Sequence, residues 1–207
     1  MFITLEGTEG SGKSSQIGPL ARYLRRKGFD VLVTREPGGT PIGEQVRAVL
    51  SNLENTAMHP RTEILLFQAS RAQLVEQVIR PHLARGGLVL CDRYADSTLA
   101  YQGYGYQTDL EQLKAIVNFA TGGLQPDLTI LLDLDVEEGL RRRARGGEWN
   151  RLDAFDLAFY QRVRQGYYQL AQAEPERWVI IDAGRSPRRV QAELRRVVEE
   201  RLGLPQT

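Results

Sequence analysis

Apolar and polar positions follow one another along this chain in the order typical of an α/β protein. Five short runs are almost entirely apolar, and we predict strands over residues 2–5, 31–34, 88–91, 128–132 and 178–181. Between them, apolar residues recur three or four positions apart, which predicts helices over residues 13–27, 42–50, 60–83, 96–104, 109–121, 136–145, 155–173 and 187–202. This alternation predicts a three-layer α/β fold, in which a parallel five-stranded sheet has helices on both faces.

Four polar segments directly follow predicted strands. They are residues 7–14, 35–40, 92–94 and 133–135. Ligands of open parallel sheets bind outside the carboxyl ends of the strands. We therefore expect these four segments to meet at one edge of the sheet.

The segment after the first strand carries the strongest motif. Its sequence, Gly7-Thr8-Glu9-Gly10-Ser11-Gly12-Lys13-Ser14, matches the phosphate-binding pattern G-x-x-x-x-G-K-[ST] and lies between a strand and a helix, as that pattern requires. Glycines let the backbone turn tightly and direct its N–H groups at phosphate oxygens. Lys13 is predicted to reach the terminal phosphates and Ser14 to bind Mg²⁺. With Ser15, these residues are the predicted ATP site.

A metal bound beside phosphates usually has a carboxylate from a strand end as its second protein partner. Asp92 and Asp133 both end apolar strands, and spacing alone does not choose between them. Either one is also compatible with a role as a turn former or helix cap.

Composition narrows the class of protein. The 207 residues suit one domain, and 27 basic residues nearly balance 26 acidic ones, so no global field favours nucleic acid or a membrane surface as a partner. The single Cys91 excludes an intramolecular disulfide and a cysteine zinc cluster. The N-terminus is a predicted strand rather than a signal peptide, and no apolar stretch has the length of a membrane span, so we expect a cytoplasmic protein.

Arginines crowd one glycine-containing segment, about residues 141–153. They are Arg141, Arg142, Arg143, Arg145 and Arg151. One interpretation is a solvated basic helix face. The other is a mobile lid whose guanidinium groups close over transferring phosphates and exclude water.

Two further pairs have both a structural and a functional interpretation. Phe67 and Arg71 lie four apart on one helix face, where they could pack in the core or contact a planar base. Tyr101 and Gln102 could be ordinary helix-end residues or ligand contacts.

With these motifs, the sequence resembles the thymidylate kinases of bacteria, members of the nucleoside monophosphate kinase group of P-loop proteins. The matching motifs occur in family order over nearly the whole chain: residues 6–14, 34–40 (Thr-Arg-Glu-Pro-Gly-Gly-Thr), 67–71, 92–94 with Ser97, Thr98 and 101–103, and 126–128. The segment 34–40 is the most diagnostic. The resemblance implies a single P-loop kinase domain that transfers the γ-phosphate of ATP to dTMP, with Mg²⁺, in dTTP biosynthesis. It also implies a homodimer, which the apolar turn Ile64–Phe67 would suit.

The resemblance implies a dTMP site formed by Glu9, Glu36, Pro37, Arg47, Phe67, Arg71, Arg93, Thr98, Tyr101 and Gln102. Arg47 and Arg93 would hold the phosphate, with Glu36 and Pro37 close by. Glu9 would contact the 3′-hydroxyl, and Tyr101 would occupy the place of a ribose 2′-hydroxyl.

Four other residues of the predicted dTMP site would recognise the base. Phe67 would stack on thymine, while Arg71, Thr98 and Gln102 would contact its polar edge. The resemblance implies that Mg²⁺ would bind at Ser14 and, through water, at Asp92, which is preferred over Asp133.

The family has two arrangements of its catalytic arginine, one in the phosphate loop and one in the lid. The loop position is Gly10 here, so the resemblance implies a catalytic lid, with Arg142 and Arg151 acting beside Lys13 and Arg93. Asn150 stands where the family usually has Asp.

Three other functions remain compatible with parts of the pattern. Another monophosphate kinase would share the phosphate loop but lack the base pocket of Phe67, Arg71 and Gln102. A deoxynucleoside kinase would have no use for two arginines that await a substrate phosphate. A nucleotide-binding switch would need neither a second nucleotide site nor an arginine-rich lid.

Overall fold

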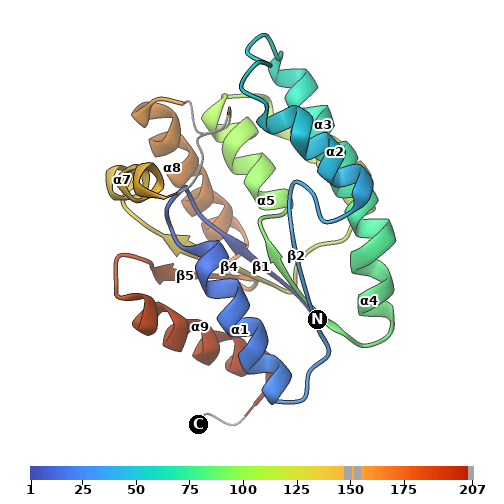
Figure 1. The fold of residues 1–207 in the computed structure, drawn as a ribbon, viewed down its shortest axis with the longest axis vertical. Coiled ribbons are helices and arrows are strands. Elements are labelled where there is room, and N and C mark those ends of the chain that lie inside the picture. Colours follow the sequence, from blue (N-terminus) through green and yellow to red (C-terminus); the bar gives the residue numbers. More distant parts are fainter. Residues whose placement is uncertain (147–150, 152–154, 205–207) are drawn as a thin grey trace.

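The fold is a five-stranded parallel sheet between two layers of helices, as the sequence predicts (Figure 1). A computed structural model describes residues 1–146, 151 and 155–204. The strands are β1 (Phe2–Glu6), β2 (Val31–Arg35), β3 (Leu88–Asp92), β4 (Leu128–Asp133) and β5 (Trp178–Asp182). Their order in the sheet is β2-β3-β1-β4-β5, and all neighbours are parallel.

Each face of the sheet is buried by its own helices. Helices α1 (Lys13–Arg26) and α9 (Pro187–Leu202) pack side by side on one face, where Ile3 and Leu5 of β1 contribute to the core (Figure 1). The opposite face is covered by a longer set of elements: α3 (Pro60–Leu74), η1 (Val75–Ile79), α4 (Arg80–Ala84), α5 (Ala95–Thr98), η2 (Leu99–Gly105) and α8 (Leu157–Ala173). Because side chains alternate along a strand, Phe2, Thr4 and Glu6 point to this second face.

In the described part of the chain, three further helices surround this framework. Helix α2 (Pro41–Ser51) packs on α3, α6 (Leu110–Thr121) packs on α3 and η2, and α7 (Val136–Arg145) packs on α8. Asp109 caps α6 through hydrogen bonds from the N–H groups of Glu111 and Gln112. Within the described residues, no helix is long and apolar enough to cross a membrane.

Every strand runs one residue beyond its predicted end, into a charged side chain. These residues are Glu6, Arg35, Asp92, Asp133 and Asp182. Backbone pairing does not require an apolar side chain, so the ladder continues after the hydrophobic run has ended. The consequence is functional, because the sheet itself rigidly places carboxylates and an arginine at its carboxyl edge.

Two predicted helices contain a wider π-helical segment. The helix predicted over 60–83 extends from Pro60 to Ala84 and widens at Val75–Ile79. Pro81 lacks the N–H that an α-helix would use there, and the wider turn precedes it. The second case, Leu99–Gly105, carries residues of the predicted dTMP site.

Candidate active site

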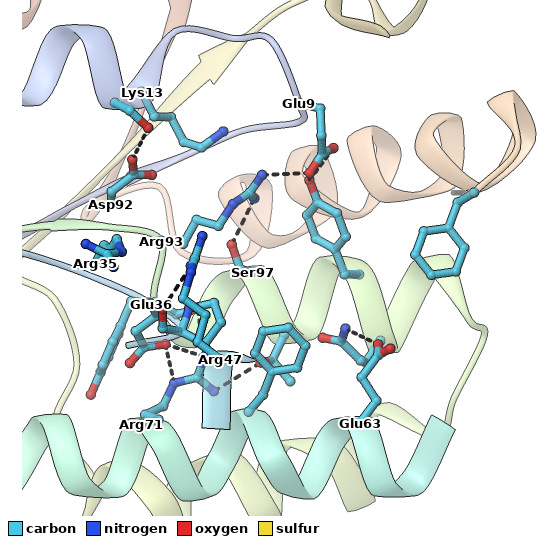
Figure 2. Close-up of a pocket in the computed structure, with 18 of the residues that line it drawn as sticks. Glu9, Lys13, Arg35, Glu36, Arg47, Glu63, Arg71, Asp92, Arg93 and Ser97 are labelled. Atoms are coloured by element: carbon cyan, nitrogen blue, oxygen red, sulfur yellow. Dashed lines mark hydrogen bonds and ion pairs between the residues drawn. The ribbon is translucent and has the colours of Figure 1, made fainter. Parts of the chain in front are cut away.

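A cavity of about 390 Å³ opens at the carboxyl edge of the sheet (Figure 2). It brings together the phosphate loop, the strand ends of β2 and β3, helix α3 and the segment 93–102. The lining residues are Glu9, Gly10, Lys13, Ser14, Arg35, Glu36, Pro37, Arg47, Glu63, Phe67, Arg71, Asp92, Arg93, Tyr94, Ser97, Thr98, Tyr101, Gln102, Arg143 and Phe155. The cavity therefore contains all ten residues of the predicted dTMP site.

The phosphate loop binds its own lysine. Lys13 Nζ donates to the carbonyl oxygens of Gly7 and Thr8, at 2.8 and 2.9 Å, and to Ser11 Oγ at 3.1 Å. Burial, followed by the nearby positive charge of Arg93, lowers the pKa of Lys13 to about 8. Helix α1 begins at Lys13, so its first N–H groups face the loop and favour an anion there.

Gly10 brings the phosphate loop into backbone contact with helix α7. Its φ of 70° is in the left-handed region, and a Cβ added there would lie 2.1 Å from the carbonyl oxygen of Gly139. In return, a Cβ on Gly139 would lie 2.4 Å from the carbonyl oxygen of Glu9. Both contacts are with backbone atoms, so neither neighbour can move aside by changing a rotamer.

The geometry distinguishes the two candidate metal carboxylates. Ser14 Oγ donates to Asp92 Oδ2 at 2.6 Å, which places a hydroxyl and a carboxylate beside the phosphate loop. Asp133 instead accepts two hydrogen bonds from Arg164 and one from Tyr168. Burial alone would raise the pKa of Asp133, but these hydrogen bonds outweigh it and hold the pKa below its ordinary value. Asp92 is thus placed with the phosphate loop, and Asp133 with helix α8.

Arg93 occupies the centre of the cavity. Its φ of 68° is unusual for a residue with a side chain and directs it back over the phosphate loop. Its guanidinium donates to Gly7 O at 3.0 Å and to Glu9 Oε1 at 2.9 Å, and it lies 4.9 Å from the centre of the Tyr101 ring. Tyr101 Oη donates to the carboxylate of Glu9 at 2.8 Å. Glu9 therefore links the phosphate loop to both residues.

A buried carboxylate lies beneath Arg93. Glu6 accepts hydrogen bonds from the backbone N–H of Tyr94 at 2.8 Å, from Ser97 Oγ at 2.6 Å and from Tyr167 Oη at 2.9 Å. It is completely buried, and burial, together with the negative charge of Asp96, raises its pKa to about 7. Its Tyr94 contact fixes the residue directly after the left-handed Arg93.

Arg71 is fully engaged by the protein. Its five N–H groups reach Glu36 twice, Gln68, Thr98 and the carbonyl oxygen of Tyr94. A guanidinium has five donors, so a contact with the thymine edge requires a bound base to replace one of these acceptors. Glu36 Oε2 accepts from Arg71, whereas its buried Oε1 has no hydrogen-bond partner. Burial raises the pKa of Glu36, against the opposing effect of Arg71.

Arg35 and Arg47 lie close together where the dTMP phosphate is expected. Both side chains line the cavity (Figure 2). Arg47 donates to the carbonyl oxygen of Pro37 at 3.0 Å, and Arg35 donates to the carboxylate of Glu44 at 2.9 Å. Burial and the proximity of Arg35 both lower the pKa of Arg47. A phosphate that binds here would relieve this repulsion.

The described lid arginines take different positions. Arg142 donates to Glu138 and to the carbonyl oxygen of Ala183, and Arg151 donates to Glu63 and to the carbonyl oxygen of Leu50. Among the described residues of the predicted lid, Arg143 is the arginine that lines the cavity, and its guanidinium donates to the carbonyl oxygen of Gly146. Residues 147–150 and 152–154 of the predicted lid, Asn150 included, lie outside the described residues.

Comparison with known proteins identifies the family. A family model described as thymidylate kinase matches residues 5–194. The chain belongs to the thymidylate kinase family. It is 50% identical over 214 residues to the thymidylate kinase of Roseiflexus sp. strain RS-1, covering 98% of this chain and 95% of that protein. It is 53% identical over 201 residues to that of Deinococcus radiodurans, covering 97% of each.

A solved structure supports the same assignment. The crystal structure of thymidylate kinase from Ehrlichia chaffeensis superposes with a TM-score of 0.78 at 34% identity, covering 96% of this chain and 98% of the other. These findings confirm the predicted family and its α/β P-loop fold. Family membership supports dTMP phosphorylation in dTTP synthesis as the activity of this chain.

Several lining residues were not singled out by their sequence. Glu63 and Phe155 contribute to the cavity without having been predicted, and Arg35, Tyr94 and Ser97 belong to predicted motifs but had no role of their own. Glu63 and Phe155 carry no local signal, because their partners are distant in the chain. Arg35 lies at the ligand edge, as expected for segment 35–40, and its charge could have marked it as a candidate phosphate contact.

Proposed function

We propose that this chain transfers the γ-phosphate of ATP to dTMP, and that one cavity holds the reacting ends of both substrates. The observation that carries this proposal is the convergence of two different sets of side chains. Lys13, Ser14 and Asp92 suit a nucleoside triphosphate with its metal, while Phe67, Thr98 and Gln102 suit a planar base. Arg93 lies between these two sets and contacts the loop carbonyl of Gly7.

Positioning and charge account for the proposed catalysis. The attacking oxygen of dTMP belongs to an ionised phosphate, so the protein needs no general base. Arg47 and Arg93 would hold that phosphate in line with the γ-phosphate, and Lys13 would neutralise charge on the ATP side. Arg142 and Arg151 remain proposed lid contacts, and the position of Arg143 adds it to that group.

The donor set fits Mg²⁺. This ion prefers oxygen ligands, keeps several waters and usually takes few protein groups. Ser14 Oγ and the Asp92 carboxylate supply two such oxygens 2.6 Å apart, beside the phosphate loop. Bound Mg²⁺ would neutralise charge on the phosphates, and Ser14 and Asp92 would hold it directly or through water. Replacement of Asp92 by Asn should raise the Mg²⁺ concentration needed for half-maximal activity.

The sugar contacts follow from the Glu9 network. Tyr101 Oη donates to both oxygens of Glu9, so the phenol is fixed against the loop. In this position Tyr101 would oppose a ribose 2′-hydroxyl, and Glu9 would accept from the 3′-hydroxyl.

The proposed location is the cytoplasm, because both substrates are nucleotides.

The proposed assembly is a homodimer. Helices α3 and α6 pack together and expose Leu65, Ile116 and Phe119, the last of these 89% exposed. We propose that these exposed apolar side chains belong to the contact face between the two chains. Light scattering should give the mass of two chains, and Phe119→Ser should shift it towards one chain.

One assay tests the proposed reaction. ADP formation from ATP is measured with dTMP, dUMP, dCMP, dGMP, AMP and thymidine as acceptors. We expect the highest kcat/KM with dTMP and loss of activity in Lys13→Ala. Negligible turnover of dTMP beside strong turnover of another acceptor would overturn the proposal, and no turnover with any acceptor would favour a nucleotide-binding switch.

A further inference from the structure

Glu63 is a buried carboxylate at the far end of the cavity from the phosphate loop (Figure 2). Only 2% of its side chain is exposed. Its Oε1 accepts from Gln102 Nε2 and from Tyr106 Oη, each at 2.9 Å, and its Oε2 accepts from Arg151 at 2.6 Å. Buried carboxylates are retained only where such donors compensate their desolvation.

The identity of these donors determines how the amide of Gln102 lies. A carboxylate held by Arg151 and Tyr106 presents only acceptor atoms, so Gln102 must turn its NH₂ group towards Glu63. The carbonyl end of the amide is then directed away from Glu63. Oε1 of Gln102 has no hydrogen-bond partner among the described residues, although the side chain is buried and lines the cavity.

We propose that Glu63 is a specificity-determining positioning residue, which holds Gln102 so that an acceptor, and not a donor, faces the nucleobase. This inference rests on the proposed function. An acceptor at this place matches a base with a ring N–H, as thymine and uracil have at N3. It opposes cytosine, whose N3 is itself an acceptor, because two acceptors would face each other without a proton.

The same carboxylate links the base pocket to the lid segment. Arg151, which follows Glu63 by 88 residues, donates to Glu63 and to the carbonyl oxygen of Leu50 at 2.8 Å. Tyr106, the third donor, packs edge-on against Phe155. Glu63 therefore positions a base-side amide and a lid arginine together, without touching the reacting phosphates.

The test compares kcat/KM for dTMP and dCMP in the whole enzyme. Glu63→Gln keeps the size of the side chain but introduces an amide that can donate or accept, so Gln102 can turn over. We expect the preference for dTMP over dCMP to fall about tenfold, the equivalent of about 1.4 kcal/mol. A purely structural role predicts that both substrates lose the same factor, and an unchanged ratio would overturn the inference.

A charge-conserving double variant provides the rescue. Glu63→Gln with Gln102→Glu exchanges the two groups, so that an acceptor-only carboxylate again faces the base while the amide stands behind it. We expect this variant to recover preference for dTMP over dCMP, and failure to recover it in a folded protein contradicts the inference. Tyr106→Phe removes a donor but leaves the contact with Gln102, and should keep the ratio of the unaltered enzyme.

The outcomes separate this inference from the proposed function. If the unaltered enzyme does not phosphorylate dTMP, the proposed function fails. If it does, and Glu63→Gln leaves the dTMP to dCMP ratio unchanged, only the role of Glu63 fails. Exposed Glu111→Gln is the matched control for loss of one carboxylate, and thermal unfolding confirms that each variant is folded.

Discussion

The buried Glu6 should make the stability of this enzyme depend on pH in a specific way. Burial and Asp96 raise its pKa from the ordinary value of 4.5 to about 7, although Ser97, Arg93 and Tyr167 oppose this change. Because the pKa is higher in the folded state, the folded protein binds more protons than the unfolded chain between these two values. The contribution of Glu6 to stability is therefore fully present below pH 4.5 and is lost as pH rises through about 7.

The expected magnitude follows from the two pKa values. A difference of one pH unit corresponds to about 1.36 kcal/mol, so the change from 4.5 to about 7 amounts to roughly 3 kcal/mol. Glu6→Gln removes the titration but keeps the size of the side chain. The free energy of unfolding of the variant minus that of the unaltered protein should then rise by roughly 3 kcal/mol between pH 4.5 and 8.

Urea unfolding at a series of pH values measures this difference. The slope with pH is the informative quantity, because the amide also disturbs the contacts with Tyr94, Ser97 and Tyr167 by an amount that does not titrate. Glu111→Gln, which removes an exposed carboxylate on α6, should lack this rise. A difference between the Glu6 variant and the unaltered protein that stays flat over the whole range would refute the reasoning.

Three shorter predictions concern the phosphate side of the cavity. Because burial and Arg93 lower the pKa of Lys13 to about 8, kcat/KM for ATP should fall as pH rises through about 8, and a constant value from pH 7 to 9.5 would contradict this. Arg143→Ala should lower kcat about tenfold or more, whereas exposed Arg141→Ala should change it little. Equal effects of the two variants would contradict the proposed role of Arg143 as a lid contact. Gly139→Ala should lower the free energy of unfolding, measured in urea, by about 1–3 kcal/mol, because the added Cβ would lie 2.4 Å from Glu9 O. Gly146→Ala is the control that should be tolerated, since the nearest atom to its added Cβ, Arg142 O, is 3.8 Å away.

The sequence was sufficient for the architecture because the architecture depends on local patterns. Five apolar runs and the helical periodicity between them predict the sheet and its covering helices, and Asp109 marks its helix start correctly. The π-helical segments escaped prediction, because periodicity records which side is buried and not how many residues complete a turn. Strand ends were placed one residue early for a similar reason, since the apolar pattern ends before the backbone pairing does.

The candidate site was predictable where a motif fixes the backbone and unpredictable where distant side chains choose partners. Spacing could not separate Asp92 from Asp133, and the structure does so through Arg164 and Tyr168, which lie 31 and 35 residues after Asp133. Glu63 gave no signal because its partner Arg151 follows it by 88 residues. Such contacts arise from tertiary packing, which a single sequence does not record.

The contact between Gly10 and Gly139 limits how this enzyme can change in evolution. An arginine in the phosphate loop at position 10 would meet the backbone of α7, so that substitution alone cannot convert the proposed lid arrangement into the loop arrangement. The helix would have to withdraw first, and its arginines would withdraw with it. Intermediates between the two arrangements would thus lack both cations at once. Positions 10 and 139 should therefore change together among relatives. A change from one arginine arrangement to the other should require a rearranged α7 and not the substitution of Gly10 alone.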